Sequence, residues 1–120
     1  MDATSFEFSM TMPGDPRLVV AVRDLTAHAA GYAGAGQAAT AALTDVVAAA
    51  AEAAIDATHV KDAPVHLQFV RESDALLVTI ACECAGDTSV PAATAGDRIT
   101  VEWTRDGARQ ICRVRQVLPA

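Results

Sequence analysis

Apolar and polar positions alternate strictly near the start of the chain. Within residues 5–12 every second side chain is large and apolar: Phe6, Phe8, Met10 and Met12. This two-residue period predicts a strand with one buried face. The stretch Pro13-Gly14-Asp15-Pro16 follows. It predicts a helix start, because an Asp side chain caps free N–H groups and Pro suits the first helical position.

Two later segments have the helical period and predict two adjacent helices. In residues 16–30 the apolar side chains of Leu18, Val22, Leu25 and Ala29 recur at spacings of four, three and four, and Gly31 is the expected stop. Residues 37–58 are rich in alanine, the best helix former, and contain neither Gly nor Pro. The glycines of the connecting segment do not indicate a phosphate loop, because such loops follow a strand and this segment follows a helix.

The alanine-rich helix has two distinct faces. Leu43, Val47, Ala50 and Ala54 fall on one face, and the carboxylates of Asp45, Glu52 and Asp56 fall on the opposite face. Because its side chains are small, neighbouring elements can approach closely. We therefore expect this helix to be a central packing element against a sheet.

The second half of the chain predicts two hairpins. Strands at 65–71 and 75–83 flank the turn-like Arg71-Glu72-Ser73-Asp74, and strands at 98–105 and 109–117 flank an Asp-Gly turn. Residues 85–97 have no periodicity and are expected to be a loop. The predicted fold class is α+β: one domain over residues 1–120, with the order β-α-α-β-β-loop-β-β. Two helices cover one face of a mostly antiparallel five-stranded sheet, in which 75–83, apolar on both faces, is central.

Composition and charge exclude several classes of function. The 120 residues are 52% hydrophobic and carry a net charge of −6, so nucleic acid and anionic membrane surfaces would repel the chain. We see neither a signal peptide nor an apolar stretch long enough to span a bilayer, and expect a cytoplasmic protein. Cys82, Cys84 and Cys112 are best interpreted as small reduced residues, because the three His residues do not have zinc-site spacing to them.

The order of elements, the Arg23 of VAVRDL and the segment AAAEAAIDATHV resemble the GHKL (Bergerat-fold) ATPases, and in particular the bacterial anti-sigma factors that are also serine kinases. The resemblance places Glu52 at the position of a catalytic general base, and Asp56 at that of an Asn that holds the magnesium ion of ATP. It implies Mg-ATP as the possible cofactor. It also implies that the first strand can lie at a subunit interface, so we expect a homodimer.

The second motif of that family, D-x-G-x-G, is altered. Glu83 stands where an Asp reads the adenine, and Gly86 is one place early, between Ala85 and Asp87 at the two glycine positions. Residues 85–97 are also too short for the lid and further helix of the family. From the residues alone, Glu52 and Asp56 are either a solvated helix face or the remnant of a nucleotide or metal site.

Two functions follow from these observations. The favoured one is a non-catalytic anti-sigma-like regulator that binds a sigma factor or an antagonist protein in a partner-switching circuit. Arg113 and Arg115, on one face of the basic closing hairpin, are its predicted partner-binding residues. The alternative is an active ATP-dependent serine protein kinase. We predict no efficient kinase activity, no bound metal and no required cofactor.

Overall fold

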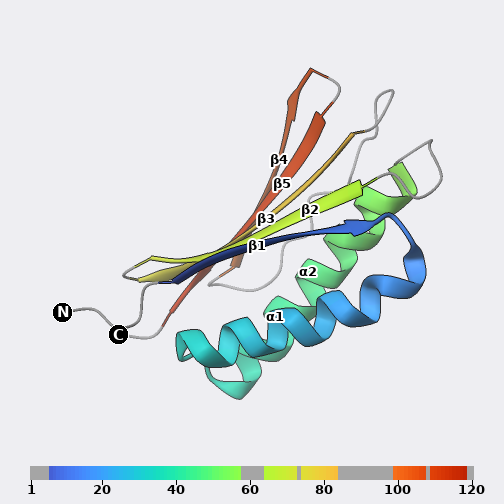
Figure 1. The fold of residues 1–120 in the computed structure, drawn as a ribbon. Helices are drawn as coiled ribbons and strands as arrows, with labels where there is room; N and C mark the ends of the chain where they lie inside the picture. The colour runs from blue at the N-terminus through green and yellow to red at the C-terminus, as the bar shows by residue number, and fades with distance from the viewer. Residues whose placement is uncertain (1–5, 58–63, 73, 84–98, 108, 119–120) are drawn as a thin grey trace.

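The computed structural model describes residues 6–57, 64–72, 74–83, 99–107 and 109–118 (Figure 1). Along the chain the elements are β1 (Phe6–Pro13), a 3₁₀ helix η1 (Pro16–Leu18), α1 (Val19–Ala33), α2 (Gln37–Ala57), β2 (Pro64–Arg71), β3 (Ala75–Glu83), β4 (Ile99–Asp106) and β5 (Arg109–Val117). The predicted order and the α+β class are confirmed, and the predicted bounds of the strands hold to within a residue.

The five strands form one antiparallel sheet in the order β1-β2-β3-β5-β4, with β3 at its centre as predicted. The pairing within each of these strand pairs is continuous. For example, Phe6 lies opposite Arg71 in β1–β2, and Thr79 lies opposite Arg113 in β3–β5. Both helices lie on the same side of the sheet, so the described elements form two layers (Figure 1). Because side chains alternate along each strand, this arrangement assigns every strand residue to the helix side or to the opposite face.

The helix start follows the predicted chemistry, and the helix end does not. Asp15 accepts a hydrogen bond from the backbone N–H of Arg17 at 3.0 Å, as expected of a capping Asp, and Pro16 opens η1. Helix α1 continues through Gly31 and ends at Ala33, so the predicted stop was wrong. The physical reason is Gly34, which adopts a left-handed φ of 93° and closes the helix through hydrogen bonds to Ala30 and Gly31.

The core lies between α2 and the middle of the sheet. The buried side chains of α2 include Leu43, Val47, Ala51 and Ala54, and they meet buried residues of the central strands such as Val78 and Ile80. By length and composition, Gln37–Asp56 is apolar enough to cross a membrane, contrary to our expectation that no segment is. In the structure its apolar face packs in the core, and its apolarity comes largely from alanine.

Candidate functional site

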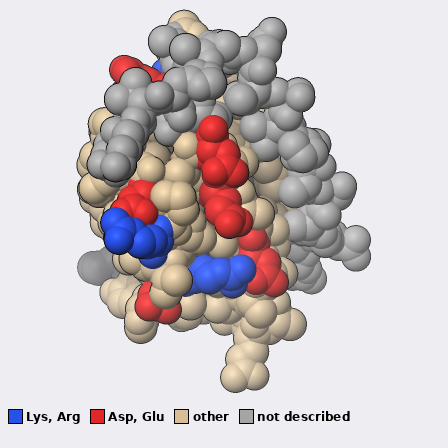
Figure 2. Space-filling model, turned by 90° about the vertical axis from the view of Figure 1, so that its right-hand side faces the viewer, with Lys and Arg blue, Asp and Glu red and all other residues tan. Residues whose placement is uncertain are grey.

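The carboxylates of α2 lie on the side of the helix that faces solvent. Asp45, Glu52 and Asp56 are all exposed, and Asp45 accepts a hydrogen bond from Arg23 of α1 at 3.0 Å. Figure 2 shows acidic side chains in a line down this face, with a basic side chain beside its lower end. Within the described residues, neither Glu52 nor Asp56 makes an ion pair.

Glu83 projects from the other layer of the molecule. The Sγ atom of Cys82, its neighbour in β3, lies 3.6 Å from the backbone carbonyl oxygen of Ala54 in α2. Because successive strand residues face opposite ways, the side chain of Glu83 points to the sheet face without helices. The fold therefore brings Glu52 and Asp56 together on one helix face and does not bring Glu83 to them.

These positions decide what the three carboxylates can do together. No group of three or more His, Cys, Asp or Glu side chains in the described part of the chain is arranged to hold a metal ion. The fourth predicted nucleotide-binding residue, Gly86, lies outside the described residues, as does Cys84. The described carboxylates thus offer separate charged surfaces, and the sheet and the body of α2 lie between them.

The predicted partner-binding arginines lie on the sheet face opposite the helices, which we call the open face. Arg113 is exposed and sits in register between Thr79 of β3 and Glu102 of β4. Arg115 lies 3.7 Å from Asp74, the Asp of the β2–β3 turn. The closing hairpin is therefore less basic than its sequence indicates, because acidic residues stand next to its arginines.

The open face carries apolar side chains in two places, on either side of a polar row that includes Gln68, Thr79 and Arg113. Val70, Leu77 and Ile111 come from three neighbouring strands, and each is half-buried although no described helix covers them. Around them lie polar side chains that bond to one another: Thr11 Oγ1 is 2.8 Å from His66 Nδ1, and Gln68 donates to Glu7 at 3.1 Å. Partly buried apolar side chains interspersed with polar and charged ones, including arginines, are the general composition of a protein-binding surface.

The two described cysteines lie on the helix side of the sheet. Cys82 and Cys112 are buried, on the adjacent strands β3 and β5. Burial raises the pKa of the Cys112 thiol to about 12. The interpretation of these residues as small buried side chains agrees with the structure, since a thiol with a raised pKa is a poor nucleophile at neutral pH.

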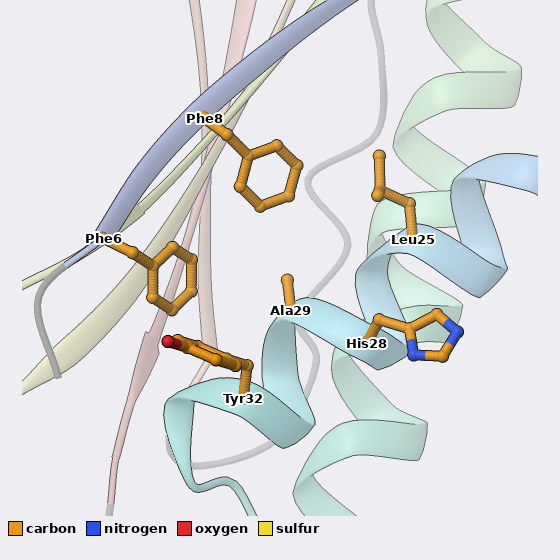
Figure 3. Close-up of a pocket in the computed structure, with 6 residues that line it drawn as sticks. All are labelled: Phe6, Phe8, Leu25, His28, Ala29 and Tyr32. Atoms are coloured by element: carbon orange, nitrogen blue, oxygen red, sulfur yellow. The ribbon is translucent and has the colours of Figure 1, made fainter.

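An apolar recess of about 330 Å³ lies between β1 and α1. It is lined by Phe6, Phe8, Leu25, His28, Ala29 and Tyr32 (Figure 3). The ring of Phe8 stacks on Phe69 at 4.8 Å between centroids, and Phe6 meets the exposed Tyr32 edge to face at 5.3 Å. The ring of His28 points away from both phenylalanines, so the recess accepts an apolar group.

The sequence patterns did not reveal this recess. They predicted that the alternate residues of β1 and the Leu25–Ala29 face of α1 are turned inward, which the structure confirms. A single small side chain, Ala29, sits between Leu25 and Tyr32 opposite the two phenylalanine rings. The signal for the recess in the sequence is a small residue, Ala29, on a helix face where Leu25 and Tyr32 are large. That signal can be interpreted only when the relative placement of β1 and α1 is known.

No family model matches the chain, and no curated protein matches it.

Proposed function

We propose that this chain is a protein-binding regulator, related to the anti-sigma serine kinases but without efficient kinase activity, and that it binds its partner through the open face of the sheet. The partner would be a sigma factor or an antagonist protein. One observation carries the proposal: Glu83 and the Glu52–Asp56 pair, which the resemblance assigns to one nucleotide site, lie on opposite sides of the two-layer fold.

Phosphoryl transfer depends on positioning and on neutralising the charge of the γ-phosphate. Within the described residues, Glu52 and Asp56 lie among exposed residues and have no ion-pair partner, so they add negative charge where a triphosphate needs positive charge. The open face, in contrast, combines half-buried Val70, Leu77 and Ile111 with the arginines of β5. That combination favours recognition of a protein surface over catalysis.

Affinity purification from the native organism followed by mass spectrometry identifies the partner, and calorimetry with the purified partner then measures the effect of variants. We expect the double substitution Arg113→Glu with Arg115→Glu to weaken binding by more than about tenfold, since like charges opposed across an interface are strongly unfavourable. Glu52→Ala should leave the affinity unchanged. Both arginines are at least partly exposed, so the fold should tolerate the change.

Nucleotide binding separates this proposal from the kinase alternative. Titration with Mg-ATP, followed by the fluorescence of Trp103 and by calorimetry, should give no saturable binding. Binding tighter than about 100 µM, within the usual range for enzyme substrates, that disappears in Glu83→Ala would favour an active kinase. Loss of partner binding in Glu52→Ala with full binding in the arginine variant would move the functional surface to the acidic face of α2.

A further inference from the structure

Strand β1 is an edge of the sheet, and within the described residues its outer side pairs with nothing. Natural edge strands are usually short, bulged, or guarded by Lys or Pro, because a free edge templates pairing with another chain. β1 has eight residues in unbroken register with β2, a single charged side chain, Glu7, and a single Pro at its end. As far as the described residues go, the edge is therefore available to an added strand along most of its length.

The apolar recess adjoins this edge. Phe6 and Phe8 are side chains of β1 itself, and they form one wall of the recess, with α1 as the other (Figure 3). A strand paired to β1 would turn every second side chain to the helix side, where the recess lies. Apolar side chains opposite Phe6 and Phe8 would then bury themselves against those rings and against the exposed Tyr32.

Glu7 determines the charge of the partner. It lies between Phe6 and Phe8, so it points to the open face, where it is exposed and bonded only to the neutral amide of Gln68 among described residues. A residue directly opposite Glu7 on an added strand would face its carboxylate, and opposite charges at such positions are stabilising. A second copy of β1, which the homodimer expected from the resemblance would place at this edge, cannot supply that charge. In every antiparallel register that stacks the apolar faces, it sets Ser, Thr, Pro or Glu opposite Glu7.

We propose that β1 binds an extended segment of another protein as an added antiparallel strand with the pattern apolar–basic–apolar. The two apolar side chains contact Phe8 and Phe6 at the recess, and the basic side chain between them pairs with Glu7. This surface is separate from the arginines of β5 and does not depend on the function proposed above. It adds a second binding site to the molecule, one that reads a short linear sequence by β-augmentation.

A capped peptide, Thr-Val-Thr-Val-Lys-Leu-Thr, tests this site with the full-length protein. Its Val-Lys-Leu lies opposite Phe8, Glu7 and Phe6 in the antiparallel orientation. We expect saturable shifts of the β1 amide signals in an NMR titration. We also expect slower hydrogen exchange at the β1 amides that face away from β2. Methylating the backbone nitrogens of the peptide that face β1 should abolish binding, because the added strand then loses its hydrogen bonds.

Charge exchange tests the role of Glu7. Glu7→Lys should weaken binding of the Lys peptide by about fivefold and tighten binding of the same peptide with Glu in place of Lys, in keeping with the strength of cross-strand charge pairs. Glu52→Lys makes the same change in net charge on the far side of α2. It should alter the affinities for the Lys peptide and the Glu peptide only by the small amount that a change in the net charge of the protein causes.

Four outcomes would overturn the proposal. The first is unchanged binding of the methylated peptide. The second is an equal response of Glu7→Lys and Glu52→Lys to both peptides. The third is a dimer in sedimentation whose β1 amides are already protected without peptide, because that result assigns the edge to a second copy of the chain. Absence of any saturable binding by the Lys peptide counts against the site in the same way.

Discussion

At the scale of single residues, Cys112 makes stability depend on pH. The folded protein keeps the thiol proton to a pKa of about 12, because burial disfavours the thiolate, whereas the unfolded chain releases it near 9.0. Above pH 9 the unfolded state therefore binds fewer protons than the folded state, and stability falls as pH rises. Each pH unit between these two pKa values lowers the free energy of unfolding by about 1 kcal/mol.

Denaturant unfolding of the wild type and of Cys112→Ala at pH 8 and pH 10.5 measures this contribution. The variant lacks the thiol, so its stability should fall less between the two pH values than that of the wild type. Comparing the two proteins cancels the titration of all other groups. Identical pH dependence in both would show that Cys112 ionises equally in the folded and unfolded chains.

At the scale of elements, two glycines near the end of α1 should respond to alanine in opposite directions. Gly34 has a φ of 93°, which an L side chain rarely adopts, so Gly34→Ala should lower the free energy of unfolding by about 1 kcal/mol. Gly31 is helical and exposed, with open space around its Cα, so Gly31→Ala should raise it by roughly 0.5–1 kcal/mol. Thermal unfolding followed by circular dichroism measures both. Equal effects would mean that Gly34 does not end the helix.

The small side chains of α2 set how closely it approaches the sheet. Ala51 is fully buried, and Ala49, two residues earlier, is exposed. We expect Ala51→Leu to destabilise the protein by about 1–3 kcal/mol through overpacking, and Ala49→Leu to change stability by less than about 0.5 kcal/mol. Urea midpoints at constant m-value provide the comparison. A tolerated Ala51→Leu would indicate spare volume between α2 and β3.

At the scale of the whole molecule, local patterns were enough to predict the architecture. The alternation through Phe6 and Phe8 and the Asp-Gly turn before β5 each depend on a few neighbouring residues, and each was confirmed. The stop at Gly31 was wrong because position 34, and not 31, takes the left-handed conformation. Which glycine ends the helix depends on which backbone carbonyl groups the N–H groups of the following residues can reach. The amino-acid composition of the segment does not predict this.

The sites were less predictable because they combine residues that are distant in the sequence. Glu83 and Glu52 were linked through a resemblance. Only the alternation of side chains along β3, which turns Cys82 toward α2 and Glu83 away from it, shows that the two carboxylates lie on different sides of the fold. The ion pair of Arg115 with Asp74 and the recess between Phe8 and Ala29 likewise depend on how elements pack together. Spacing within one element cannot supply that information.

The position of β1 also shapes the order in which the protein can fold. Phe6 pairs with Arg71, so closing β1 onto β2 has to bring together segments separated by both helices, and the entropy of closing this long loop opposes the step. The β2–β3 and β4–β5 hairpins join neighbouring segments and can form early. We therefore expect the strand that carries Phe6, Glu7 and Phe8 to dock after these hairpins have formed, and the recess that it forms with α1 to exist only from that step on.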